Sequence, residues 1–454
     1  MSFPKYPKYK ASGVEWLGDV PEGWEVSRLK RVCHVFPSNV DKKSHDGETP
    51  VKLCNYTDVY YNETITADME FMAATASTEQ IAKFTLRAGD TIITKDSETA
   101  NDIAIGAYVP ADLPGVVCGY HLSMIRPMAE TNGAFIKRLF DSVYVKGCVE
   151  VRANGLTRVG LGQYEIDNLD LPFPSLAEQV AIAAFLDRET AKIDGLVAEQ
   201  KRLMELLKEK RQAVISHAVT KGLDPHAKMK PSGVEWLGDV PEHWEVKRLK
   251  YVMSIMPGFS FASSDFVDEG VQLIRIGNLY LNELSLDRDP IFLPPAFEFQ
   301  YGDYIVTFGD LLMSLTGTLG KKDYGYAVLL RSASKFLLNQ RVARLRCRDS
   351  IIPKYAEHLL QSRFYTEQIH RLPFGTKQAN LSSSDVLGAV IPLPPMVKQI
   401  EIANFLDSEL SKFDTLTAEA ERAIDLLQER RTALISAAVT GQIDVRKINT
   451  NQGV

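Results

Sequence analysis

The chain has 454 residues, of which 45% are apolar and 24% are charged, and its formal net charge is −6. This length accommodates roughly two to four domains with cores of their own, and the composition excludes a disordered or fibrous protein. The negative charge argues mildly against a free-standing nucleic-acid binder, unless the basic residues gather on one face or partner subunits supply the phosphate contacts.

The composition also indicates the cellular compartment and the redox state of the cysteines. The five cysteines are scattered, without a CxxC pair or a Cys/His cluster, which argues against a zinc site and a disulfide framework. No apolar run approaches the ~18 residues that cross a bilayer, and the start of the chain lacks an apolar signal core. We therefore expect a reduced, cytoplasmic protein that needs no membrane.

The first predicted element is a tryptophan-rich segment that the chain contains twice. Residues 12–30 read SGVEWLGDVPEGWEVSRLK, and residues 232–250 read SGVEWLGDVPEHWEVKRLK. All four tryptophans of the protein lie in these two copies. We interpret their apolar side chains as a clip that fastens the start of each half onto its core.

Other pairs of matching segments along the rest of the chain are separated by the same number of residues as these two copies. Gln179 matches Gln399, and FLDRETAKID at residues 185–194 matches FLDSELSKFD at residues 405–414. The middle parts of the two halves, by contrast, are scarcely alike. The sequence is therefore a tandem duplication in which constant frames surround two variable inserts.

Each insert mixes strands with helices, which predicts the α+β class. Short β-branched and aromatic runs indicate strands at residues 90–95, 103–110, 121–127, 303–308, 326–330 and 341–347. Helical stretches are expected at residues 133–150 and 352–369.

A long helix is predicted after each insert, because residues 176–224 and 396–454 contain no proline and are rich in Ala, Leu, Glu, Lys and Arg. A seven-residue repeat marks one face of each helix and predicts a coiled-coil pair, with a plain amphipathic core helix as the alternative. The repeat consists of Ile193, Gln200, Leu207 and Val214 with Leu196 and Leu203 three positions on, and of Phe413, Ala420, Leu427 and Leu434 with Leu416 and Ala423.

Signals of catalysis are missing from the sequence. There is no HExxH, GxSxG, Walker or Rossmann motif, and the histidines are dispersed. The Pro-Pro pairs are followed by Ala296 and Met396, unlike the Asn/Asp-Pro-Pro-aromatic motif of amino-methyltransferases. We predict that this chain holds no active site, metal ion or cofactor.

The sequence resembles the specificity (S) subunit of Type I restriction–modification enzymes over essentially the whole chain. The motifs that carry the resemblance are the repeated tryptophan segment, LPFPSLAEQVAIAAFLDRETAKID from residue 171, and KRQAVISHAVTKG from residue 210, each with its copy in the second half. The second copy departs at Lys398, which stands where the first has Glu178 and removes a carboxylate favourable to the helix dipole.

The resemblance implies a pseudo-twofold α+β duplication, with two α/β target recognition domains separated by two long antiparallel coiled-coil helices. The implied segments are recognition domains at residues 1–175 and 226–395, a central conserved helix at 176–225, and a C-terminal helix and tail at 396–454. Each domain would read one half of a split double-stranded DNA sequence, while the helices act as spacer. Two methyltransferase subunits would dock on the frames, and motor–nuclease subunits would complete the restriction complex. S-adenosylmethionine, ATP and Mg would be used by these partners.

Candidate DNA-contacting residues come from polar runs next to predicted strands, because direct readout needs polar side chains on loops that reach base edges. For each of them the alternative is a solvated loop or a phosphate contact. The candidates are Thr94, Lys95, Ser97, Thr99, Asn101, Tyr120, His121, Asn154, Thr157 and Arg158 in the first half, and Ser314, Thr316, Thr318, Lys321, Lys322, Asn339, Gln340, Arg341, Thr376, Lys377, Gln378 and Asn380 in the second.

Two other functions compete with this reading. One is a self-contained DNA modification or restriction enzyme whose active site has no recognised motif. The other is a coiled-coil scaffold whose variable inserts bind proteins.

Overall fold

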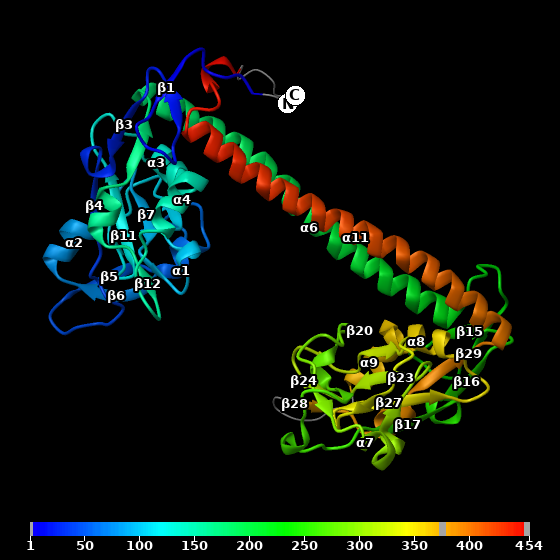
Figure 1. Ribbon diagram of the computed structural model, residues 1–454. Helices are drawn as coiled ribbons and strands as arrows, with labels where there is room; N and C mark the ends of the chain where they lie inside the picture. Colours follow the sequence, from blue (N-terminus) through cyan, green and yellow to red (C-terminus); the bar gives the residue numbers. More distant parts are fainter. Residues whose placement is uncertain (1–2, 372–377, 449–454) are drawn as a thin grey trace. The chain divides into compact units, whose positions relative to one another are not determined.

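The computed structural model describes residues 3–371 and 378–448 and divides into two compact units. Unit 1 comprises residues 1–200 and 421–454, and unit 2 comprises residues 201–420. The division falls within both long helices, α6 (Leu176–Lys221) and α11 (Met396–Val439), which confirms the two helices expected from the proline-free segments (Figure 1).

Unit 1 is built from short strands and helices that precede α6. The strands are β1 (Tyr9–Ala11), β2 (Asp19–Pro21), β3 (Glu25–Arg28), β4 (Cys33–Pro37), β5 (Thr49–Cys54), β6 (Met72–Ala76), β7 (Thr91–Thr94), β8 (Asp96–Ser97), β9 (Gly106–Tyr108), β10 (Val116–Cys118), β11 (Leu122–Pro127), β12 (Val159–Gly160) and β13 (Asp170–Phe173). The helices are α1 (Tyr56–Tyr60), α2 (Thr78–Phe84), α3 (Gly133–Phe140), α4 (Val143–Glu150) and α5 (Gln163–Asp167).

Unit 2 has a related series of elements before α11. The strands are β14 (Met229–Pro231), β15 (Asp239–Pro241), β16 (Glu245–Arg248), β17 (Met253–Pro257), β18 (Val271–Ile274), β19 (Leu279–Tyr280), β20 (Glu283–Leu284), β21 (Phe292–Leu293), β22 (Ile305–Val306), β23 (Leu311–Ser314), β24 (Thr316–Thr318), β25 (Ala327–Leu329), β26 (Phe336–Leu338), β27 (Val342–Cys347), β28 (Gln378–Asn380) and β29 (Val390–Leu393). The helices are α7 (Phe297–Gln300), α8 (Pro353–Gln361), α9 (Arg363–His370) and α10 (Ser383–Gly388).

The same antiparallel sheet forms in both units although the inserts share little sequence. Its strand order is β4-β11-β7-β9 in unit 1 and β17-β27-β23-β25 in unit 2. A central strand needs only apolar side chains on its buried faces, so different residues can fill it. Both β7 and β23 are buried along their whole length, as the apolar runs predicted.

A second sheet in each unit shows where the inserts diverge. Both units keep a parallel pair, β5 with β10 and β18 with β26, in corresponding register. In unit 1 the other neighbour of β5 is β6, whereas in unit 2 the pair is extended by β21 and β22. In unit 2 the parallel pair is therefore flanked on both sides, by β21 next to β18 and by β22 next to β26, whereas in unit 1 a single bridge from Thr85 to Val117 lies beside β10.

Each predicted helical stretch after the sheet is two helices rather than one. The break falls at Ser142 between α3 and α4, and at Ser362 between α8 and α9. Each serine hydroxyl caps the second helix by accepting from a backbone N–H at 3.2 Å, and it donates to a carbonyl oxygen of the first at 2.6 Å. A serine at this position favours a cap over a continuous helix.

A two-stranded clasp closes each insert. Strand β3 pairs with β13, and β16 pairs with β29, both antiparallel. Just inside the clasp, the Leu29 N–H donates to the Leu169 carbonyl at 2.9 Å, and Leu249 makes the equivalent bond to Ala389 at 2.8 Å. The insert therefore leaves and re-enters the frame at neighbouring points.

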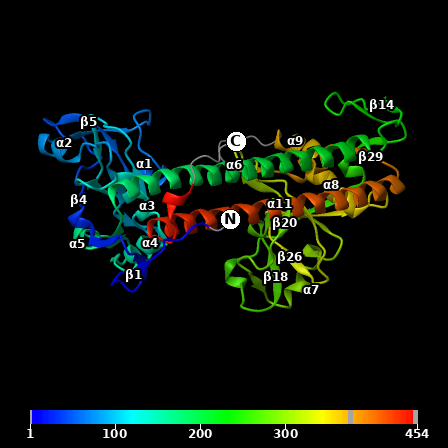
Figure 2. The ribbon, with the colours of Figure 1, turned by 90° about the horizontal axis from the view of Figure 1, so that it is seen from above.

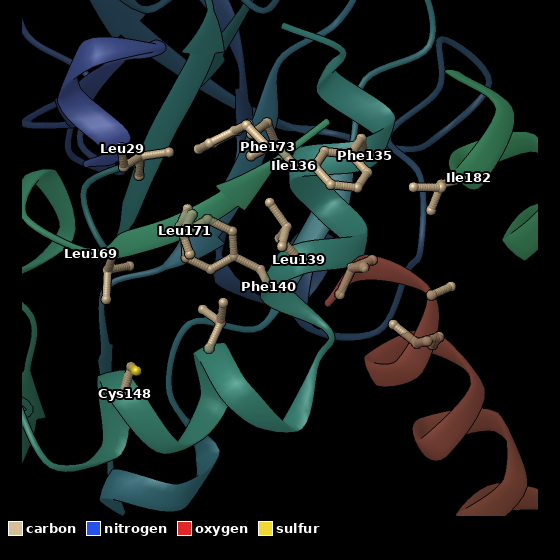
Figure 3. Close-up of a cluster of buried hydrophobic side chains, with 14 of the residues drawn as sticks. Leu29, Phe135, Ile136, Leu139, Phe140, Cys148, Leu169, Leu171, Phe173 and Ile182 are labelled. Carbon is tan, nitrogen blue, oxygen red and sulfur yellow. The ribbon is translucent and has the colours of Figure 1, made fainter. Parts of the chain in front are cut away.

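The core of unit 1 lies between the clasp, α3, α4 and the long helices. Figure 3 shows Leu171 and Phe173 of β13 beside Phe135 and Phe140 of α3, with Ile182 of α6 nearby. Leu434, Ile435, Ala438 and Val439 of α11 belong to the same cluster. Each insert is thus held by the helices as well as by the clasp.

The four tryptophans divide into two kinds. Trp24 and Trp244 are buried in the cores, as the clip interpretation predicted. Trp16 and Trp236 are 59% and 48% exposed, so the interpretation is wrong for this pair. The turn between the strands of each hairpin, β1–β2 and β14–β15, carries them on the outside of the unit.

The two long helices pair within each unit through a seam that keeps one of the two predicted columns. Ile193, Leu207, Phe413, Ala420 and Leu434 are buried as expected, whereas the prediction is wrong for Leu196, Leu203 and Leu416. In unit 1, where Figures 1 and 2 show the start of α6 beside the end of α11, Ile193 is 5% exposed whereas Leu196 is 46% exposed. The seam advances by four and then three residues, through Ile193, Val197 and Gln200. Leu203 and Leu416 are exposed and lie outside it. This seam continues the buried stripe of Ile182 and Leu186, whose side chains pack α6 against the core. The packing of α6 on the core therefore decides which face of the helix forms the seam.

Equivalent arginines in the seam make ion pairs that fix the antiparallel sense. In unit 1 the Arg431 guanidinium contacts Asp194 at 3.0 Å, and in unit 2 Arg211 contacts Asp414. As the residue number increases on one helix it decreases on the other, so the helices run antiparallel. Polar residues in a coiled-coil seam favour one register over the alternatives.

In unit 1, Glu63 extends this seam contact into the variable insert. Its carboxylate contacts Arg431 at 2.8 Å, Arg138 at 3.1 Å and the Lys137 ammonium. Burial by itself raises the pKa of Glu63, but these three cations outweigh it and lower the pKa to about 2. The ionised carboxylate therefore links the insert of unit 1 to α11.

The repeated glutamine is a buried clamp at the start of each long helix. The Gln179 side chain accepts from the Asn132 N–H at 2.9 Å and donates to the carbonyls of Pro174 at 2.9 Å and Glu130 at 3.2 Å. Gln399 makes the matching bonds to Ile352, Pro394 and Ser350, each at 2.9 Å. The clamp joins the helix to the loop that precedes α3 or α8.

Candidate nucleic-acid interface

In unit 1, candidates lie on three chain segments that hydrogen bond to one another. These are residues 94–97, 119–122 and 158–161, which we call platform 1. The Lys95 N–H donates to the His121 carbonyl at 3.0 Å, and the Leu161 N–H donates to the Lys95 carbonyl at 2.8 Å. Strands β8 and β12 pair antiparallel across it. Lys95, Tyr120, His121 and Arg158 are thus brought together from distant parts of the sequence.

The side chains of platform 1 hold one another in place. The Asp96 carboxylate, which was not among the candidates, contacts the Nδ1 of His121 at 2.9 Å and the guanidinium of Arg158 at 3.9 Å. The Lys95 ammonium lies 4.5 Å from the ring centroid of Tyr120 and donates to the Ser38 carbonyl at 3.0 Å. Burial lowers the pKa of Lys95, although Asp96 acts in the opposite direction.

A pocket of about 460 Å³ adjoins platform 1. Its lining includes Tyr120 and His121 together with residues that sequence reasoning missed, namely Lys42, Lys43, Asn55 and Tyr56. The only signal for them in the sequence was the Lys42-Lys43 pair in a polar loop. Basic and aromatic side chains in one concave surface are suited to phosphate contact and base stacking.

Unit 2 carries platform 2, formed by residues 314–317, 339–342 and 378–381. The Leu315 N–H donates to the Arg341 carbonyl at 2.9 Å, and the Leu381 N–H donates to the Leu315 carbonyl at 2.8 Å. Strands β24 and β28 pair in the register of β8 and β12, since Thr316 lies opposite Asn380 as Asp96 lies opposite Gly160. The backbone of the platform is therefore common to both units.

Platform 2 presents a different set of side chains. Gln340, Arg341 and Gln378 are exposed, and Thr316 and Asn380 lie opposite each other on the β24–β28 ribbon. Within residues 3–371 and 378–448, no hydrogen bond or ion pair holds the Arg341 guanidinium. Its donors are not engaged by this part of the chain and can serve a ligand.

Three candidates within the platforms are buried, and two of them brace neighbouring turns through hydrogen bonds. The Thr94 hydroxyl accepts from the Ile105 N–H at 3.1 Å, and the Ser314 hydroxyl accepts from the Tyr326 N–H at 3.0 Å. Ser97 is 3% exposed. These positions support the platforms from within rather than facing solvent.

The remaining candidates are dispersed around the platforms. Thr99, Asn154 and Thr157 are exposed on the loops of unit 1, and Asn101 is exposed in the short 3-10 helix Ala100–Asp102. Thr318, Lys321 and Lys322 are exposed on the turn that begins at the end of β24. Asn339 is half-buried at the edge of platform 2. Thr376 and Lys377 lie outside the described residues.

No group of three or more His, Cys, Asp or Glu side chains in the described part of the chain is arranged to hold a metal ion. No helix there has both the length and the apolar character that a bilayer crossing requires.

The fold thus defines a tandem protein with two like units, each with a platform that keeps its backbone and changes its side chains. The family model of the Type I restriction modification DNA specificity domain matches residues 21–204 and 241–425, one copy in each half of the chain. The chain belongs to this family.

Individual relatives match along much of their length. The MjaX specificity subunit of Methanocaldococcus jannaschii, named as a putative type I restriction enzyme, is 23% identical over 98% of this chain and 99% of its own. The EcoKI type I specificity subunit of Escherichia coli K12 is 22% identical over 94% and 90% of the two chains.

Two solved structures share the fold. A chain from a structure on the assembly and conformational transition of the type I R-M system has a TM-score of 0.70 and 19% identity, over 93% of this chain and 99% of its own. The HsdS subunit from Thermoanaerobacter tengcongensis has a TM-score of 0.53 and 19% identity, over 93% and 98%.

Proposed function

We propose that the chain is the DNA sequence-specificity subunit of a Type I restriction–modification complex, in which each unit recognises one half of a bipartite double-stranded target. The observation that carries this proposal is the pair of specificity domains whose platforms share a backbone but not side chains. One scaffold with two sets of polar side chains is suited to reading two different base sequences. The chain contributes recognition and no catalysis.

The experiment is to reconstitute the chain with its methyltransferase and to sequence the methylated adenines of the host genome. A motif of two short specified halves around an unspecified spacer is expected. The purified chain by itself is expected neither to methylate nor to cleave DNA, because S-adenosylmethionine, ATP and Mg serve partner subunits. Methyl transfer by the chain alone would favour the self-contained enzyme, and a complex that retains no duplex DNA would favour the protein-binding scaffold.

The net charge of −6 agrees with such a complex. A subunit that shares the phosphate contacts with partners needs no basic excess of its own. Because its substrate would be the cell's own DNA and incoming DNA, we place the complex in the cytoplasm, together with motor–nuclease subunits.

The repeated tryptophan segment is the proposed docking site for two methyltransferase subunits. Burial explains why Val20 and Trp24 recur in the second copy, since both side chains lie in the core. It does not explain the recurrence of Glu15 and Trp16, which are exposed in the first copy as their counterparts are in the second. Identical exposed residues on two otherwise divergent units suit identical partners.

Replacing Trp16 or Trp236 by alanine is expected to remove one methyltransferase subunit from the complex, and the double replacement should remove both. A central tryptophan in an interface contributes about 2 kcal/mol or more, which is roughly a thirtyfold loss of affinity. The measurement is the mass of the complex at fixed concentration. Tyr251→Ala is the matched control, because Tyr251 is 60% exposed but has no aromatic counterpart at the equivalent Arg31. Retention of both subunits by the double variant would refute this docking site.

The paired helices are proposed to set the spacer of the target. Adding seven residues after Gln200 and seven after Ala420 keeps the seam in register and lengthens each helix by about 10 Å. The spacer in the methylated motif is then expected to grow by about three base pairs, since DNA rises about 3.4 Å per pair. Adding two residues at each point is the control and should abolish assembly, because it turns the seam away from its partner. An active seven-residue variant with an unchanged spacer would contradict the proposal.

A further inference from the structure

The two platforms differ at three polar positions that lie together in space. They are Asp96, His121 and Arg158 on platform 1, and the equivalent Thr316, Arg341 and Gln378 on platform 2. The backbone bonds that place these positions are alike, at 3.0 and 2.8 Å on platform 1 and 2.9 and 2.8 Å on platform 2. Differences in what the platforms bind must therefore arise from the side chains.

On platform 1 a carboxylate occupies the centre of this group. Asp96 contacts His121 within hydrogen-bonding distance and forms a longer ion pair with Arg158, without a hydrogen bond, at 3.9 Å. The Asp96 side chain is only 20% exposed, whereas those of His121 and Arg158 are 42% and 58% exposed. A carboxylate beside an arginine attracts the guanidinium electrostatically and so competes with a base edge for it.

On platform 2 the carboxylate is replaced by the hydroxyl of Thr316. Arg341 precedes β27 and is exposed, with no partner for its guanidinium among residues 3–371 and 378–448. Its backbone is held by Leu315, so the side chain leaves a fixed point of the platform. A planar fork of free donors matches the two acceptors, O6 and N7, that guanine presents in the major groove.

We infer that Arg341 is a specificity-determining residue that reads a guanine in the half-site of unit 2, and that the residue at position 316 decides whether this arginine is free to do so. This inference rests on the proposed function. Platform 1, with Asp96 at the corresponding place, does not make the equivalent guanine contact from a free arginine.

The test uses the reconstituted methyltransferase complex of the full chain, with Arg341→Gln and Thr316→Asp as the variants. Arg341→Gln removes the fork. Thr316→Asp leaves Arg341 intact but places a carboxylate where Asp96 stands on platform 1. Arg348→Gln is the matched control, because Arg348 is also exposed and lies just beyond the opposite end of the same strand, β27. Thermal unfolding of each variant shows whether the fold is kept.

Both variants are expected to lose discrimination at one guanine of the half-site of unit 2, by roughly 5- to 150-fold in affinity. The other half-site and the spacer should be unchanged, and Arg348→Gln should keep the wild-type motif. The readouts are the methylated motif in genomic DNA and binding to duplexes in which each specified base is varied.

Three results would overturn the inference. The first is a uniform loss of affinity for all sequences, which marks a phosphate contact. The second is a change in the half-site of unit 1. The third is a folded Arg341→Gln complex that keeps the wild-type motif. Failure of the proposed function would look different, because the wild-type complex itself would then give no bipartite motif.

Discussion

Exchanging residues 30–168 for the insert of another family member is expected to replace one half of the DNA target completely and to leave the other half unchanged. The clasp explains why the exchange is feasible. Strands β3 and β13 belong to the constant frame and hold the two ends of the insert next to each other, joined by the bond from Leu29 to Leu169. A foreign insert therefore joins the chain of the frame at one place, the clasp, and otherwise meets the frame through its packing against the long helices.

Packing against the long helices sets the condition for this exchange. Phe135 and Phe140 of α3 lie in the same cluster as Ile182 of α6 and Leu434 of α11. The incoming insert must supply apolar side chains at these points, since loss of one large core side chain costs about 3–5 kcal/mol. The measurement is the methylated motif of the chimaera, and exchange of residues 250–388 is the reciprocal control. The modular prediction fails if a folded, active chimaera changes both halves of its motif or neither.

Replacing Gln179 by alanine is expected to lower the free energy of unfolding of unit 1 by about 2–5 kcal/mol, because buried hydrogen-bonding groups of Asn132 and Pro174 lose their partner. Gln179→Glu should also be destabilising, since the new carboxylate faces two carbonyl oxygens to which the amide donated. Gln399→Ala should have the corresponding effect on unit 2.

Urea unfolding of the full chain measures these changes. Val180→Ala provides the control, because Val180 is the next residue on the same helix and is 48% exposed. Its replacement should alter stability by less than about 1 kcal/mol. If Gln179→Ala were no more destabilising than Val180→Ala, the clamp would not contribute to the stability of the unit.

The duplication, the long helices and the strands of the common sheet were predictable from the sequence, because each rests on a local or repeated pattern. Proline-free runs and apolar runs such as residues 91–94 identify helices and strands without reference to the rest of the chain. The polar candidates were chosen in the same way, by proximity to a predicted strand. That signal does not separate the buried Thr94 from the half-buried Lys95 beside it, because burial depends on residues distant in the sequence.

Only the tertiary structure determined the features that depend on contacts between residues distant along the chain. Leu196 and Leu203 fit a seven-residue repeat as well as Val197 and Met204 do, and only the docking of α6 on its core selects between the two stripes. Trp16 and Trp24 share one short segment, yet Trp16 lies exposed in the turn of the β1–β2 hairpin whereas Trp24, which follows β2, packs into the core. The platforms likewise require three separate segments to meet. A sequence specifies such meetings only through the free energy of the whole fold, which no single stretch of residues contains.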